Sequence, residues 1–216
     1  MAYVRRDRSA HPVVAYCADI GSVAKKHFAW ARGAASSREC LRGSDPRELA
    51  AAVAADLMRR TPVALGFECP LFVPVPEDPA RLTARRDGEG QRPWSAAAGA
   101  ASLVTGLTET VWVLRELRRL VSAGVAAFLE WEAFRASGTG LFLWEAFVTS
   151  GGKGSGHSHD AEIAVQRFLA LIAELTQGNA VQQSGPVHSL VGAALLRTGW
   201  GTDLALLETP CLVIKT

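Results

Sequence analysis

Short apolar runs alternate with longer segments of helical period along the chain. Residues 12–22, 27–33 and 37–43 are runs of strand length that end at glycine or serine and follow one another closely. Such runs predict three strands joined by tight turns in an antiparallel meander. Further strands are predicted at 61–72, 128–138 and 140–150, and an edge strand at 210–216.

Helices are predicted where apolar residues recur at three- or four-residue steps. The first begins at Asp45-Pro46, because aspartate caps a helix and proline suits its first position. The others are predicted at 95–121, 160–175 and 188–200. This order of elements predicts an α/β fold with a mixed sheet, antiparallel at its start and parallel, through right-handed crossovers, afterwards.

Composition and charge narrow the class of protein. The 216 residues fit a single domain, 1–216, with a loose basic arm at 1–11. Hydrophobic residues make up 49% of the chain and charged residues 20%, which excludes a disordered protein. The net charge of +2 is small, so any contact with nucleic acid must come from local patches.

The cysteines and the distribution of apolar residues indicate the compartment of the protein. The four cysteines form no CxxC pair, which argues against a zinc ribbon and favours reduced thiols. The chain shows no signal-peptide pattern and no uninterrupted apolar run of about 18 residues. We therefore expect a cytoplasmic protein without membrane association.

Four acidic residues stand at strand ends or at a helix start. Asp19 ends the first strand, Glu68 follows the fourth, Glu145 lies in the strand at 140–150, and Asp160 opens a helix. The carboxyl ends of parallel strands line the crevice where α/β proteins bind ligands, so these side chains are candidate catalytic residues. Carboxylates gathered in this way need a cation, and Mg²⁺ or Mn²⁺ suits oxygen ligands. Such a site can hydrolyse a phosphodiester.

Each acid also has a structural interpretation. Asp19 can be a turn residue before glycine, and Glu145 can alternate to a solvated face. Asp160 can be the N-cap or a first-turn acid of its helix. Glu68 is harder to explain in this way, because an acid at the end of so apolar a run needs a partner.

Two loops carry candidate substrate contacts. Lys153, in the glycine-rich loop, can approach a phosphate as a point charge, although its sequence lacks the spacing of a P-loop. The loop 73–94 carries residues that can contact a nucleic-acid backbone or stack on a base, with a solvated loop as the alternative: Arg81, Arg85, Arg86, Arg92 and Trp94.

Three histidines lie near the candidate acids or at a helix start. His157 and His159 belong to a glycine-rich loop and lack the i, i+4 helical pairing of zinc hydrolases, so a dedicated zinc site is not expected. His188 is predicted at a helix start, where capping or packing is its expected role.

Several short motifs resemble an uncharacterised family of predicted ribonuclease-H-like nucleases, related to Holliday-junction resolvases. They are D-I-G at 19–21, H-F-A-W-A at 27–31, E-C-P-L at 68–71 with an arginine-rich loop after it, W-E-A-F at 144–147 and H-D-A-E-I-A at 159–164. The resemblance covers nearly the whole chain. It implies a ribonuclease-H-like three-layer fold with a mixed five-stranded sheet, its first three strands antiparallel, and flanking helices.

The resemblance also implies a function. It suggests cleavage of DNA or RNA, with Asp19 and Glu68 as metal ligands and Asp160 completing the set. In this fold the final acid belongs to the last helix, where the present chain carries His188 instead. An imidazole there would be an alternative ligand or general base.

Two other interpretations stay open. D-I-G-S-V-A-K-K at 19–26 also looks like the first phosphate-binding loop of actin-like kinases and ATPases. In that setting Asp19 would position Mg²⁺, and the backbone of Gly21 and Ser22 would contact phosphate. The third interpretation is a non-catalytic binding domain of the ribonuclease-H-like fold.

Overall fold

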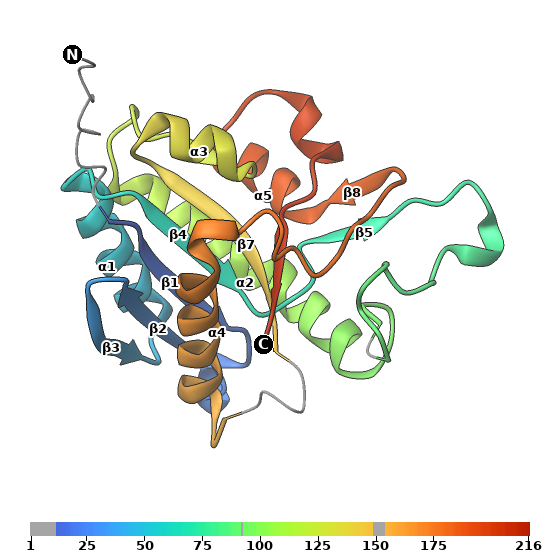
Figure 1. The fold of residues 1–216 in the computed structure, drawn as a ribbon, viewed down its shortest axis with the longest axis horizontal. Coiled ribbons are helices and arrows are strands. Elements are labelled where there is room, and N and C mark those ends of the chain that lie inside the picture. The colour runs from blue at the N-terminus through green and yellow to red at the C-terminus, as the bar shows by residue number, and fades with distance from the viewer. Residues whose placement is uncertain (1–11, 92, 149–153) are drawn as a thin grey trace, which may run out of the picture.

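A mixed sheet forms the centre of the protein in the computed structural model, which describes residues 12–91, 93–148 and 154–216 (Figure 1). The predicted arm at 1–11 lies outside these residues. The strand order is β3-β2-β1-β4-β7-β6, and β9 also pairs with β7. The strands of this sheet are β1 (Val14–Asp19), β2 (Ala29–Ala34), β3 (Ser37–Gly43), β4 (Val63–Phe67), β6 (Ala127–Phe128), β7 (Leu141–Phe147) and β9 (Leu212–Lys215).

The strand directions confirm the predicted mixed sheet. The pairs β1/β2 and β2/β3 are antiparallel, whereas β1/β4, β4/β7, β6/β7 and β7/β9 are parallel. The number of strands is seven and not five, so that part of the expectation was wrong. The two additional strands are short and share the outer edge of β7. There β6 pairs with Leu141 and Phe142, and β9 pairs with the stretch from Trp144 to Phe147.

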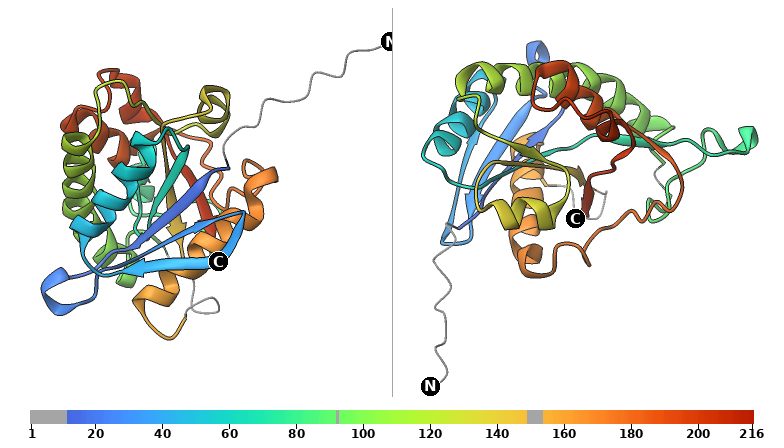
Figure 2. Two further views of the ribbon diagram at one scale, coloured as in Figure 1. Left: turned by 90° about the vertical axis from the view of Figure 1, so that its left-hand side faces the viewer. Right: turned by 90° about the horizontal axis from the view of Figure 1, so that it is seen from above.

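Helices cover both faces of the sheet, as the view from above shows (Figure 2). The helices α1, α2 and α5 lie on one face, and α3 and α4 lie on the other. Their bounds are α1 (Pro46–Met58), α2 (Ala97–Leu120), α3 (Trp131–Ser137), α4 (His157–Leu171) and α5 (Leu190–Thr198). Short 3-10 turns occur at η1 (Val23–Lys25), η2 (Pro79–Arg81), η3 (Ile172–Glu174) and η4 (Leu204–Glu208).

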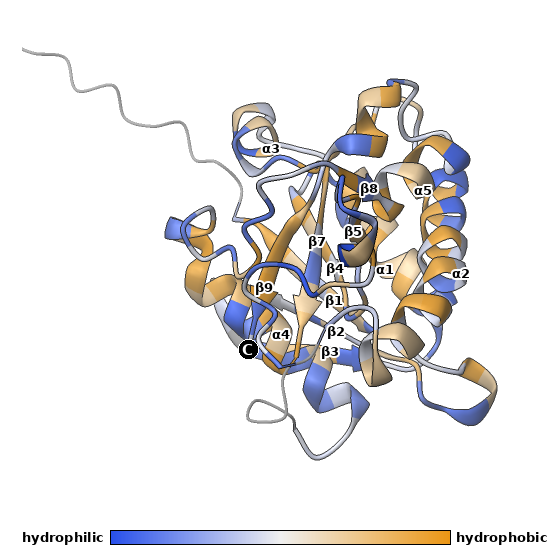
Figure 3. Cartoon of the chain, turned by 90° about the vertical axis from the view of Figure 1, so that its right-hand side faces the viewer, coloured by the Kyte–Doolittle hydropathy of each residue, from blue (hydrophilic) through white to orange (hydrophobic). Residues whose placement is uncertain are grey.

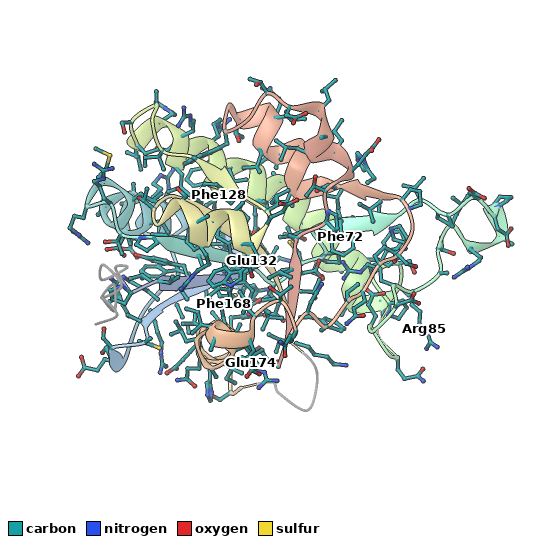
Figure 4. The ribbon with its side chains drawn as sticks, turned by 45° about the horizontal axis from the view of Figure 1, so that its top comes forward. Phe72, Arg85, Phe128, Glu132, Phe168 and Glu174 are labelled. Carbon is teal, nitrogen blue, oxygen red and sulfur yellow. The ribbon has the colours of Figure 1, made fainter. Side chains whose placement is uncertain are left out.

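Alternation along the strands divides the core into two clusters. Tyr16 and Ala18 point toward α1, α2 and α5, whereas Ala15 and Cys17 point toward α3 and α4. The α4 cluster is rich in aromatic rings, among them Phe168, which is labelled in Figure 4 and whose ring centroid lies 4.8 Å from that of Trp144. The face of the sheet to which a residue points therefore follows from its position along the strand.

The tetrapeptide W-E-A-F occurs twice and adopts two conformations. At 144–147 it is part of β7, and at 131–134 it forms the first turn of α3. The predicted strand at 128–138 was therefore wrong over most of its length. In α3 the buried residues are Trp131 and Phe134, three positions apart, and Gly138 ends the helix with φ 68°.

A second, two-stranded sheet was not predicted. It pairs β5 (Phe72–Pro74) with β8 (Val187–Ser189) in antiparallel register, so that His188 lies opposite Val73. His188 is thus in a strand, and the N-cap of α5 is Ser189, whose side chain accepts a hydrogen bond from the Gly192 amide.

The helix α2 is long and apolar enough, by length and composition alone, to be a candidate membrane span. In the fold, however, Val113, Leu114 and Leu117 are buried in the core, and α2 packs against α1 and α5. Figure 3 shows both hydrophilic and hydrophobic residues along α2, and Val104, Leu107 and Leu120 are exposed. This is the arrangement of a surface helix in a soluble-type α/β fold.

Candidate functional site

Two carboxylates lie side by side where β1 and β4 end. The parallel register pairs Ala18 with Phe67, and the Glu68 amide donates to the Ala18 carbonyl over 2.8 Å. Asp19 follows Ala18 at the end of β1, and Glu68 follows Phe67 at the end of β4. Both alternate to the face that carries Cys17, and their charges add to burial in raising the pKa of that thiol. Asp19 and Glu68 therefore stand at the ends of neighbouring strands, on the same face of the sheet.

A histidine of α4 reaches this pair. His157 is the first residue of the helix, and its Nδ1 lies 2.6 Å from Oδ2 of Asp19. Asp19 is only 6% exposed, whereas the imidazole is half-exposed and its ring centroid lies 5.3 Å from that of His27. The Asp19 carboxylate is thus fixed from the side of α4.

The strand ends open into a cleft of about 580 Å³. Polar groups of its lining come from Asp19, Glu68, Arg86, Glu89, Gln91, Ser102, Glu145 and His157. Most of the remaining surface is apolar and comes from residues 93–99 at the start of α2 and from the end of β7. A cleft of this size, lined mainly by apolar surface and a few converging polar groups, is typical of a small-molecule or substrate site.

Glu145 also lines the cleft but points to the opposite face of the sheet. Its register partner is Phe67, which belongs to the α2-side cluster. Glu145 is 1% exposed, so the alternative of a solvated face was wrong. Its Oε1 lies 2.5 Å from Nη2 of Arg86, and its Oε2 accepts from Nη1 of Arg86 at 2.8 Å and from the Leu71 amide at 2.9 Å. These contacts engage both oxygens in structure.

Asp160 and His188 are not brought to Asp19. The Asp160 carboxylate is buried in the first turn of α4, where its Oδ1 accepts from the Gly154 amide at 2.5 Å. It does not line the cleft. His188 is exposed on β8 and borders a separate hollow of about 280 Å³ between α2 and α5. Asp160 is therefore a buried first-turn acid, and the capping role was wrong because the N-cap of α4 is Gly156.

No group of three or more histidine, cysteine, aspartate or glutamate side chains could hold a metal ion within residues 12–91, 93–148 and 154–216. The expected set of Asp19, Glu68 and Asp160 does not form such a group. Two carboxylates, Asp19 and Glu68, remain as neighbours in one cleft.

The basic residues predicted to contact a substrate differ in burial and position. Arg85 is exposed on the outside of its loop, away from the cleft, and donates to the Gly90 carbonyl at 3.0 Å (Figure 4). Arg86 is 1% exposed, so its expected contact with a nucleic-acid backbone was wrong. Lys153 and Arg92 lie outside the residues that the structure describes.

The chain matches no protein-family model, and no curated protein or solved structure is significantly similar to it. The site is therefore interpreted from its own geometry.

A further acid near Asp19, Glu109, was not among the predicted site residues. It lies on α2 and its Oε2 accepts from the Gly21 amide at 3.2 Å. Burial, the largest cause, together with the charge of Asp19, raises the pKa of Glu109 to about 7, against the opposing effect of the Gly21 hydrogen bond. Its position within an apolar helix could have marked it for attention, but the contact itself depends on how α2 crosses the sheet.

The raised pKa of Glu109 makes stability depend on pH. Its ordinary pKa of 4.5 in the unfolded chain is lower than in the fold, so the unfolded state releases the proton first. Stability associated with this group is fully present below about pH 4.5 and is lost as the pH rises through 7. We expect Glu109→Gln, which keeps an acceptor for Gly21, to melt increasingly above wild type between pH 5 and 8. A difference in melting temperature between the two proteins that stays constant from pH 5 to 8 would contradict the raised pKa of Glu109.

Proposed function

We propose that the protein is a metal-dependent nuclease that hydrolyses phosphodiester bonds at Asp19 and Glu68. The observation that carries the proposal is the placing of these two carboxylates on neighbouring parallel strands, at their carboxyl ends and in one cleft. The order β3-β2-β1-β4-β7, with its first three strands antiparallel and helices on both faces, supports a ribonuclease-H-like assignment of the fold.

The donor set fits Mg²⁺ or Mn²⁺. Magnesium takes oxygen ligands and is usually held by one or two carboxylates, with waters and substrate phosphates completing its shell. Asp19 and Glu68 supply two such groups without a third protein ligand. When bound, a cation of this kind lowers the pKa of a water molecule and stabilises the charge that develops on phosphate oxygens.

The chain's own residues orient the site. His157 holds one oxygen of Asp19 through Nδ1, which fixes the direction of the carboxylate. The near-complete burial of Asp19 limits competition from bulk water. Because β1 and β4 are central strands of the sheet, the two carboxylates stand on a rigid support.

The actin-like interpretation has less support. It requires the backbone at 21–22 to contact a phosphate, but the Gly21 amide donates to Glu109. A carboxylate at this position would repel a phosphate.

Cleavage of defined nucleic acids tests the proposal. Single-stranded DNA and RNA, their duplexes, the hybrid and a branched DNA junction would be incubated with the full chain and Mg²⁺ or Mn²⁺. We expect at least one substrate to be cut, with no cleavage in EDTA. Absence of cleavage on every substrate with both cations would refute the nuclease and favour a non-catalytic binding domain.

A further inference from the structure

One tryptophan forms part of the apolar lining of the cleft. Trp94 is half-buried, and the other apolar residues that line the cleft include Pro93, Phe147 and Val148. A partly accessible indole in an apolar wall is a surface on which a planar ring can pack. Asp19, Glu68 and His157 line the same cleft, so a ligand can touch the indole and the carboxylates at once.

Trp94 is held in position by both its ring and its backbone. The indole Nε1 donates to the Ala84 carbonyl at 2.9 Å, and the Trp94 amide donates to Oε1 of Glu89 at 3.2 Å. At Gly99, a Cβ would lie 2.4 Å from the Pro93 carbonyl oxygen and 3.0 Å from Cα of Trp94. This close approach requires glycine and places α2 directly against the tryptophan.

A buried chain of charges connects Trp94 to the sheet. Glu89, which accepts from the Trp94 amide, also accepts from the backbone amide of Arg86 at 2.7 Å and from its Nε at 2.8 Å. Arg86 in turn pairs with Glu145 of β7 and lies over the Phe72 ring at 4.6 Å. Glu145 is therefore a positioning residue for the cleft wall, connected to Trp94 through Arg86 and Glu89.

The charges of the cleft limit what it can bind. Among the described lining residues the arginine is Arg86, and its guanidinium is already engaged by Glu89 and Glu145. The described lining residues therefore offer a phosphate backbone no uncommitted arginine, and the attractions that they supply are the apolar wall and a cation held by the acids. The bases of a duplex are stacked inside the helix, whereas an unpaired base can pack on an indole.

We infer that the cleft takes an unpaired nucleotide of a single strand, with its base on Trp94 and its phosphodiester toward Asp19 and Glu68. The inference rests on the proposed function for the role of the two acids. The volume of about 580 Å³ lies within the range of pockets that hold small ligands, and so suits a nucleotide rather than a duplex.

Strand binding measured without cleavage tests the inference. A fluorescein-labelled single-stranded DNA of 12 nucleotides, and the same strand annealed to its complement, would be titrated with the full chain carrying Asp19→Asn in Mg²⁺. In that background we expect Trp94→Ala to weaken single-strand binding about 10- to 100-fold, because base stacking on an aromatic ring contributes this much. Trp94→Phe should stay within about threefold, and the duplex should bind at least about tenfold more weakly.

The matched control is Trp112→Ala. Trp112 is a half-buried tryptophan of α2 that contacts Arg47 and does not line the cleft, so its loss should leave binding unchanged. Equal binding of single strand and duplex, or an unchanged affinity in Trp94→Ala, would overturn the inference. If Trp94→Ala does not fold, the comparison of single strand with duplex decides.

The two proposals fail in different ways. Trp94-dependent single-strand binding without cleavage in the wild type would keep the inferred ligand and refute the nuclease. Asp19-dependent cleavage with no effect of Trp94→Ala on binding would keep the nuclease and refute the inferred ligand.

Discussion

Replacing Arg86 with alanine should destabilise the protein by about 3–5 kcal/mol, because two buried carboxylates would lose their common cation. Arg86 is 1% exposed, Glu89 is 2% exposed and Glu145 is 1% exposed, so the two carboxylates depend on the guanidinium and little on solvent for their hydrogen bonds. The lost contacts include four side-chain hydrogen bonds, to Glu89, to the Phe72 carbonyl and, twice, to Glu145. Urea unfolding at neutral pH measures the effect.

The adjacent Arg85 provides the matched control. It is exposed, and its side chain donates to the Gly90 carbonyl. Arg85→Ala should change the free energy of unfolding by less than about 0.5 kcal/mol, as exposed substitutions usually do. If Arg86→Ala were as stable as Arg85→Ala, the buried network would not hold the cleft wall.

Asp19→Asn should lower metal-dependent cleavage at least about 100-fold. Stabilisation of transition-state charge by a cation amounts to several kcal/mol, and about 1.4 kcal/mol corresponds to a tenfold change in rate. Asparagine keeps the shape of Asp19 and an oxygen opposite Nδ1 of His157, so the effect isolates the negative charge. Initial rates on the best substrate, with melting temperatures of both proteins, measure it.

His157→Ala should have a smaller effect on the same assay. A group that orients a metal-binding carboxylate typically contributes about 10- to 100-fold to affinity or activity. His159, which contacts Ser155 instead of Asp19, supplies the control variant His159→Ala. A ranking in which His157→Ala is harmless and His159→Ala is not would contradict the role given to His157.

The early part of the fold could be predicted because local signals agree there. The runs that became β1, β2 and β3 have strand length and end at turn residues, and Asp45 caps α1 by accepting from the Arg47 amide at 2.7 Å. Asp19 and Glu68 could be placed together because parallel strands end on the same side of a sheet.

The two copies of the tetrapeptide W-E-A-F adopt different structures because their surroundings in the fold differ. The sequence W-E-A-F is a strand at 144–147, where residues 141–146 are buried on both faces of the sheet. At 131–134 the same letters form a helix, because Trp131 and Phe134 reach the core while Glu132 and Ala133 are exposed. A tetrapeptide is too short to show which of the two periods applies.

The surroundings of Asp19 depended on packing between distant elements. His157 and Glu109 belong to helices on opposite faces of the sheet, and no spacing in the sequence shows that both approach the end of β1. The face of the sheet to which Glu145 points, in contrast, could have been predicted, because alternate residues of a strand point to the same face. Counting back along β7 places it with Leu141 and Leu143, which face α2.

Titration with Mn²⁺, followed by the electron paramagnetic resonance of the free ion, tests the metal site most directly. The wild-type chain should bind Mn²⁺, and the double variant Asp19→Asn, Glu68→Gln should lose this binding while its melting temperature stays at or above that of the wild type. Equal Mn²⁺ binding by the folded double variant would contradict the assignment of Asp19 and Glu68 as the centre of a metal-dependent nuclease.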